Sequence, residues 1–196
     1  MLMSRCFFGY TVVFLAVVLS WMGLMNGRLG ISISRAEGMS TTPSLICKGN
    51  EDATFLSEWE KRVEKDKLYL YAIKLFNMPL ECKATVSSID ENNKFVMLLF
   101  SFTDGNVFSF ENYVPNGFTS TLKAPKGFPD EKDAQSVLEA YSRYMGAKID
   151  WTRPERSTEE GNQVEIFGDS RSGINKSAVM VYKNNRLVEI EFGVAP

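Results

Sequence analysis

The sequence predicts an α+β domain, in which an antiparallel sheet of hairpins packs with two main helices, preceded by one N-terminal transmembrane or signal helix. Three observations predict this class: an uncharged run near the start, segments with helical spacing of apolar residues, and segments in which apolar residues alternate. The 196 residues are 44% hydrophobic and 23% charged, which is an ordinary globular composition. We therefore expect one domain with a single core over residues 45–196.

The run Phe7 to Met25 carries no charge. As a helix it spans roughly 28 Å, close to the roughly 30 Å hydrocarbon core of a bilayer. Residues 1–25 are therefore predicted to be a signal or anchor helix that places the chain in a membrane. The best cleavage candidate, Ser34-Arg35-Ala36, lies well beyond Met25, so we favour an uncleaved signal-anchor over a protein secreted after signal cleavage.

Residues 26–44 are rich in Gly, Ser and Thr and are predicted to be a linker or stalk. The numbers of Lys and Arg residues before and after the apolar run are similar, so they give little indication of its orientation in the membrane. Because a domain that follows a single N-terminal signal is most often exported, we expect residues 45–196 to be extracytoplasmic, periplasmic or extracellular. Cys47 and Cys82 are the two cysteines of this domain. They suit one disulfide in an oxidising compartment, with two unrelated buried thiols as the alternative.

The first predicted helix carries Phe55, Trp59 and Val63 at a spacing of four residues. One of residues 50–52 is expected to cap it. The following segment, Leu68 to Phe76, is too apolar to show a clear period. It either prolongs the first helix or forms a buried strand. We favour the helix, because Pro79 is a natural stop and Ala72, Lys74 and Leu75 are good helix formers.

A meander of three antiparallel strands is predicted over residues 84–89, 94–103 and 107–114, because Asn-Asn and Asp-Gly turns separate alternating segments. Phe108 and Phe110 are expected to face the core.

The best-specified element is a second main helix. Asp130 is expected to cap it, apolar residues recur along it to Met145, and Gly146 is expected to end it. Residues 151–161 are predicted to be an exposed loop. Three more strands are expected in the order VEIF, SAVMVY and LVEIEF, at 164–167, 177–182 and 187–192.

The chain contains no histidine. This excludes Ser-His-Asp and Cys-His catalytic arrangements and zinc sites that use histidine. Residues 45–196 hold 19 Lys and Arg against 23 Asp and Glu without a basic stripe, which argues against nucleic-acid binding. We expect no cofactor, no metal site and no enzymatic activity.

The segment Val164 to Gly173, VEIFGDSRSG, resembles the first block of the GDSL, or SGNH, hydrolase family. The resemblance implies that Ser170 is a nucleophile. We set this aside, because Arg171 stands where the family has leucine, only 26 residues follow Ser170, and no histidine is present to take its proton. A tight turn between two strands is the preferred interpretation.

Carboxylate chemistry remains as an alternative, in the form of an envelope hydrolase that acts on a saccharide. Two groups of acidic residues are candidates for it. Each group also has an ordinary role, the first at a helix start and the second in a solvated loop. The groups are Asp130, Glu131 and Asp133, and Glu155, Glu159 and Glu160.

Four residues are the candidate binding positions. Trp151 beside Arg153, and Tyr113 with Phe118 near an Asn-Gly turn, are of the types enriched in binding hot spots. Packing of the aromatic rings on the core is the alternative. The favoured function is a non-enzymatic binding module: an inhibitor, an immunity-type protein or an accessory protein of an envelope complex. Its partner would be another envelope protein or an exported protein. A structural membrane component ranks last, since the apolar run lacks GxxxG.

Overall fold

The computed structural model describes residues 47–49, 51–89, 93–113, 117–169 and 176–195. Within these residues an eight-stranded antiparallel sheet and three α-helices form, which confirms the α+β class. The predicted N-terminal helix and the linker lie outside the described residues. In the part of the chain that is described, no helix combines the length and the apolar character needed to cross a bilayer.

The helices are α2 (Ala53–Val63), α3 (Lys67–Phe76) and α4 (Glu131–Tyr144), with the short 3₁₀ helix η1 (Thr103–Gly105). The strands are β1 (Glu81–Ser88), β2 (Lys94–Ser101), β3 (Val107–Tyr113), β4 (Gly117–Lys123), β5 (Glu155–Glu159), β6 (Asn162–Gly168), β7 (Lys176–Lys183) and β8 (Arg186–Val194).

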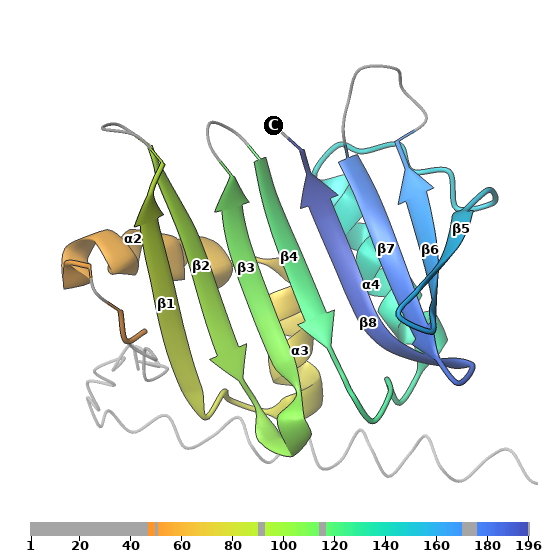
Figure 1. The fold of residues 1–196 in the computed structure, drawn as a ribbon, viewed down its shortest axis with the longest axis horizontal. Coiled ribbons are helices and arrows are strands. Elements are labelled where there is room, and N and C mark those ends of the chain that lie inside the picture. The colour runs from red at the N-terminus through yellow and green to blue at the C-terminus, as the bar shows by residue number, and fades with distance from the viewer. Residues whose placement is uncertain (1–46, 50, 90–92, 114–116, 170–175, 196) are drawn as a thin grey trace, which may run out of the picture. The chain divides into compact units, whose positions relative to one another are not determined.

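The sheet consists of two four-stranded meanders that meet in its centre. Its order is β1-β2-β3-β4-β8-β7-β6-β5, so the last strand of each meander pairs with the other (Figure 1). Helices α2 and α3 precede the first meander, and α4 precedes the second. Each half therefore repeats the plan of helix followed by meander, and the β4–β8 pairing joins the halves.

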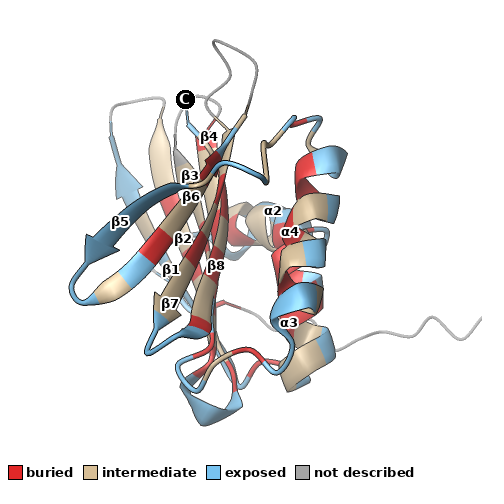
Figure 2. Cartoon of the chain, turned by 90° about the vertical axis from the view of Figure 1, so that its right-hand side faces the viewer, coloured by how far each residue is buried: buried red, intermediate tan, exposed pale blue. Residues whose placement is uncertain are grey.

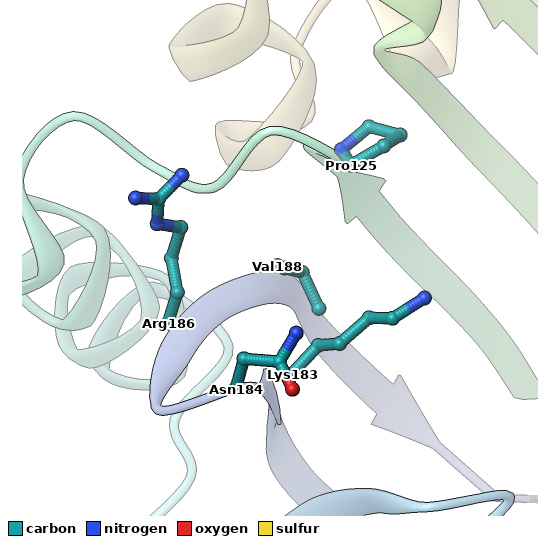
Figure 3. Close-up of a pocket in the computed structure, with 5 residues that line it drawn as sticks. All are labelled: Pro125, Lys183, Asn184, Arg186 and Val188. Atoms are coloured by element: carbon teal, nitrogen blue, oxygen red, sulfur yellow. The ribbon is translucent and has the colours of Figure 1, made fainter.

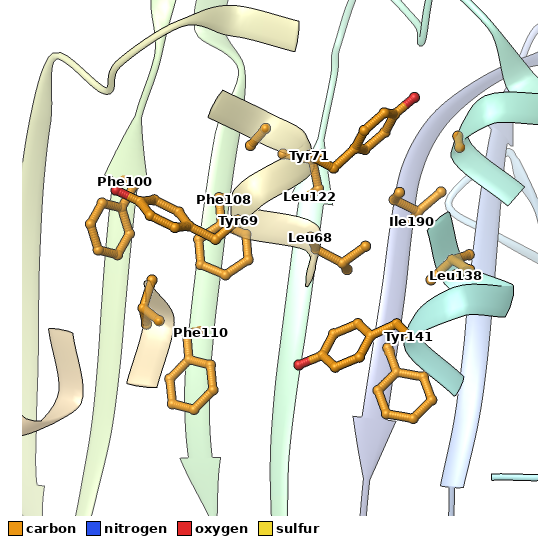
Figure 4. Packing of buried hydrophobic residues seen from close by; sticks show 14 of the residues in the cluster. Leu68, Tyr69, Tyr71, Phe100, Phe108, Phe110, Leu122, Leu138, Tyr141 and Ile190 are labelled. Carbon is orange, nitrogen blue, oxygen red and sulfur yellow. The ribbon is translucent and has the colours of Figure 1, made fainter. Parts of the chain in front are cut away.

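All three helices lie on one face of the sheet, and no described helix lies on the other (Figure 2). Their apolar sides meet the buried residues of the strands. Phe108, Leu122 and Ile190 are fully buried in this layer together with Leu68 of α3 and Leu138 of α4 (Figure 4). The expectation that Phe108 and Phe110 face the core is confirmed.

The structure has two separate helices, α2 and α3, where the sequence predicted that one helix is prolonged. The Asp52 side chain caps α2 by accepting from the backbone N–H of Thr54 at 2.5 Å. Asp66 has an extended backbone and caps α3. The chain therefore turns between Val63 and Lys67, and the described fold has three main helices rather than two.

The carboxylate of Asp66 joins three elements inside the core. One oxygen accepts from the backbone N–H groups of Leu68 at 2.8 Å and Tyr69 at 3.1 Å. The other accepts from the hydroxyl of Ser120 on β4 at 2.5 Å and from the hydroxyl of Tyr141 on α4. Asp66 is only 5% exposed, and this burial raises its pKa although the four hydrogen bonds favour the charged form.

A disulfide between Cys47 and Cys82 closes a loop of 35 residues, as the cysteine count predicted. It holds the segment before α2 against β1, the outer strand of the sheet. The backbone of Lys48 donates to the Cys82 carbonyl at 3.1 Å and accepts from the Ala84 N–H at 2.8 Å. The Cys47 N–H donates to the Glu60 carboxylate of α2 at 2.7 Å. This single bridge covers part of the β1 edge, around Lys83, where backbone groups would otherwise be unpaired.

Two strands were not predicted. Strand β4 was not predicted because its buried residues include the polar Ser120 and Thr121, so the segment shows no alternation of apolar residues. Strand β5 lies within residues 151–161, which were predicted to be a loop. All five of its residues are exposed, because it is an edge strand, and the prediction was right about exposure but wrong about structure.

We expect Asp66→Ala to lower the free energy of unfolding by about 3 kcal/mol, because it removes a helix cap and leaves two buried hydroxyls without their acceptor. The matched control is Asp52→Ala, which removes an exposed cap from α2 and should lower the free energy of unfolding by clearly less. Urea unfolding of the two variants measures the difference. Equal losses would show that the contacts of Asp66 with β4 and α4 add nothing to its capping role.

We expect Cys47→Ala and Cys82→Ala each to lower the free energy of unfolding by about 3–4 kcal/mol, because either change opens the loop in the unfolded chain. The double variant should lose no more than either single variant. Cys6→Ala serves as the control and should leave the unfolding midpoint unchanged. If the double variant loses about twice as much unfolding free energy as each single variant, the two cysteines act independently, which contradicts a disulfide effect.

Candidate binding surface

The predicted aromatic residues lie at the rim of the core. The ring of Trp151 is 5.0 Å from that of Phe167. The ring of Phe118 lies 5.8 Å from Phe110 and 6.3 Å from Phe192. Both are half-buried, so packing accounts for their position, and their role in binding stays a prediction.

The other two predicted positions are also placed by the fold. Arg153 is exposed in the connection between α4 and β5. The backbone of Tyr113 pairs with that of Gly117 where β3 leads into β4. Trp151 and Arg153 thus belong to the half of the fold that contains α4 and strands β5 to β8. Tyr113 and Phe118 belong to the half that contains α2, α3 and strands β1 to β4.

The face of the sheet opposite the helices, here called the open face, is the stronger candidate surface. Along β2 the buried residues Val96, Leu98 and Phe100 alternate with half-buried ones. Since successive side chains of a strand point to opposite faces, the half-buried set lies on the open face. The strand register extends this assignment across the sheet.

Two apolar strips lie on the open face. A sheet with one wet face normally shows apolar residues only on its buried side. Strands β2, β6 and β7 depart from this rule, because they carry large apolar side chains on both faces. The first strip is Phe95, Met97 and Leu99 on β2, and the second is Val164 and Ile166 on β6 with Val179 and Val181 on β7. Strands that are apolar on both sides are typical of sheets covered on both sides.

A polar stripe on the three central strands separates the two apolar strips. Thr121 on β4 lies beside Glu191 on β8, and Thr119 lies beside Glu111 on β3. Glutamates outnumber lysines over the whole open face. The acidic side chains are Glu81, Glu111, Glu155, Glu159, Glu189 and Glu191, and the basic ones are Lys83, Lys123 and the cross-strand pair Lys183 and Arg186 at the end of the β7–β8 hairpin.

Glu191 lies in the middle of this polar stripe. Burial raises the pKa of its carboxyl, and the nearby charges of Glu189 and Glu111 raise it further. Two groups act in the opposite direction: the Thr121 hydroxyl donates to Glu191 at 3.2 Å, and the ammonium of Lys123 lies nearby. Lys123 is also paired with Glu189 at 3.1 Å, so its charge is shared. The stripe therefore keeps an excess of negative charge on a partly desolvated surface.

Of the acidic groups proposed for hydrolysis, the first lies at a helix start, as considered, and the second is exposed on and beside edge strand β5 rather than in a loop. Asp130 caps α4 by accepting from the N–H groups of Lys132 and Asp133 at 2.9 and 3.1 Å. Glu155 and Glu159 lie exposed on β5, and Ser170 lies outside the described residues. Within the described ranges no three Cys, Asp or Glu side chains are grouped so as to hold a metal ion.

We expect Glu191→Gln to be neutral or stabilising near pH 7.5, because the substitution removes a charge whose burial is costly. Since the folded pKa of Glu191 is raised, that cost is present above this pKa and disappears as the pH falls through it. The stability difference between variant and parent should therefore shrink towards pH 4. Urea unfolding at the two pH values measures it, with the exposed Glu159→Gln as control. If Glu191→Gln is less stable than the parent at pH 7.5 but not at pH 4, the raised pKa of Glu191 is contradicted.

No protein-family model, curated protein or solved structure matches this chain. The open face is therefore interpreted from its own geometry and charge.

Proposed function

We propose that the chain is a non-enzymatic binding module, held at or exported across a membrane by Phe7–Met25, and that a protein partner docks on the open face. One observation carries this proposal: two apolar strips lie on a side of the sheet that no described helix covers (Figure 2). Partly exposed apolar side chains that gather on one face and have polar neighbours are typical of an interaction site.

The charge of the open face indicates the chemistry of that partner. Burying Glu111, Glu189 and Glu191 against an apolar or acidic surface would leave negative charge without compensation. Pairing with lysine or arginine side chains removes this cost and orients the partner. A partner with a basic centre and apolar flanks therefore fits best. Two copies of the open face would bring like charges together, which disfavours self-association.

The disulfide supports the compartment assigned to this function. A bond between Cys47 and Cys82 indicates an oxidising, extracytoplasmic compartment. Anchoring by the apolar run, rather than release after cleavage, is part of the proposal.

The hydrolase remains the second candidate, and the described pocket gives it no support. That pocket is lined by Pro125, Lys183, Asn184, Arg186 and Val188 and has no carboxylate among these residues. A glycosidase needs two carboxyl groups that flank its substrate.

Photo-crosslinking tests the proposal on the full-length chain in its native membranes. A photoreactive amino acid at Val179 or Leu99, one in each apolar strip, should give one adduct of the same mass. The matched control places it at Ser136, an exposed position on α4 on the other side of the sheet, and should give none. Adducts from Ser136 alone, or none from either strip, would overturn the proposal.

A charge reversal then tests the chemistry of the partner. We expect Glu111→Lys to reduce the crosslinking yield from Val179 at least tenfold, because it places a cation opposite the partner's basic residues. Glu58→Lys on the exposed side of α2 changes the net charge equally and should leave the yield unchanged. Loss of the adduct in both variants would show an effect of net charge, which contradicts recognition by the stripe.

A further inference from the structure

A pocket of about 360 Å³ lies where the β7–β8 hairpin meets the connection between β4 and α4 (Figure 3). Pro125 comes from the connection, and the other four lining residues, Lys183, Asn184, Arg186 and Val188, come from the hairpin. Two of these side chains are cationic and one is an amide. Pro125 and Val188 add apolar walls.

The backbone fixes both cationic residues at this pocket. Asn184 and Asn185 have φ angles of 53° and 58°, as a two-residue hairpin turn requires. This turn pairs Lys183 with Arg186 across the two strands. The register then shifts near Val188, whose carbonyl accepts from the Ala124 N–H at 2.7 Å. The shift thus holds the β4–α4 connection against the hairpin and closes one side of the pocket.

Arg186 is held in place by its own contacts. Its side chain lies along Gly127, where an added Cβ would come within 2.0 Å of Arg186 Cδ. Its Nη1 donates to the Lys126 carbonyl at 2.8 Å. A guanidinium has five N–H donors, so this bond leaves others for a ligand while it restricts the side chain. A positioned guanidinium loses less entropy on binding than a mobile one.

The positive charge at the pocket is not offset by ion pairs there. Among the ion pairs of the described residues, none involves Lys183 or Arg186. The nearby lysines are paired elsewhere: Lys123 with Glu189 at 3.1 Å, and Lys126 with Asp104 at 2.6 Å. No carboxylate lines the pocket. An acidic chain thus has a pocket lined by two cationic residues and no acidic one, with the two charged ends pointing in different directions (Figure 3).

We propose that this pocket binds an oxyanion, a carboxylate or phosphate group, carried by a small molecule with an apolar part. The guanidinium of Arg186 would form charge-assisted hydrogen bonds to the anion. The ammonium of Lys183, which points in another direction in Figure 3, would add to the positive potential of the pocket. Pro125 and Val188 would contact the apolar part of the ligand. The volume fits a small molecule. This site lies at the end of the β7–β8 hairpin, and its proposal does not depend on the protein partner of the open face.

Isothermal titration calorimetry of the full-length chain in detergent, in a phosphate-free buffer of low ionic strength, tests the proposal. The probes are inorganic phosphate and benzoate, which represent the two kinds of oxyanion. We expect at least one of them to bind with a Kd of about 1 mM or lower. In the double variant Lys183→Gln and Arg186→Gln its affinity should fall at least tenfold. The preferred probe identifies the class of anion.

The matched control is Lys61→Gln with Lys132→Gln, which removes the same charge from exposed positions on α2 and α4. It should bind like the parent. Lys183→Gln alone, at a position with no described ion pair, provides a second variant in case Arg186→Gln perturbs the fold, and it should also weaken binding. No binding of either probe up to about 10 mM, unchanged binding in both pocket variants, or an equal loss in the control would overturn the proposal.

Discussion

The arrangement of the helices depends on one buried carboxylate. Asp66 ends the turn between α2 and α3, caps α3, and accepts hydrogen bonds from β4 and α4. Because β4 is the strand that pairs with the second meander, this one side chain contacts elements from both halves of the chain. Four neutral donors replace the water that the carboxylate loses. The cluster holds the helices α3 and α4 over the centre of one face and leaves the opposite face to solvent or to a partner.

Much of the fold was readable where apolar spacing dominates. The alternation around Phe108 and Phe110 and the helical spacing from Ala134 to Met145 predicted β3 and α4 with small errors at their ends. Strand β4 could not be predicted, because Ser120 is buried as the hydrogen-bond donor of Asp66, which lies 54 residues earlier in the sequence. The strand order was equally hidden, since it rests on pairings between residues as distant as Thr121 and Glu191.

The candidate surface was predicted less well than the fold. Trp151 and Phe118 were chosen by residue type, but residue type does not reveal that their rings lie 5.0 Å from Phe167 and 5.8 Å from Phe110. A signal for the open face was nevertheless present. Strand β2 reads KFVMLLFS, which is apolar on both faces, and such a strand predicts cover on both sides. The pocket could not have been found, because it needs the register shift near Val188.

The central pairing also constrains how the molecule is made. Strand β8 is the last described strand to leave the ribosome, yet it lies in the middle of the sheet, between β4 and β7. Until it has been synthesised, β4 and β7 each present an unpaired edge that will lie inside the finished sheet, and such edges are prone to aggregation. Biosynthesis therefore includes an interval in which the first meander is complete but the strand that joins it to the rest of the sheet is missing.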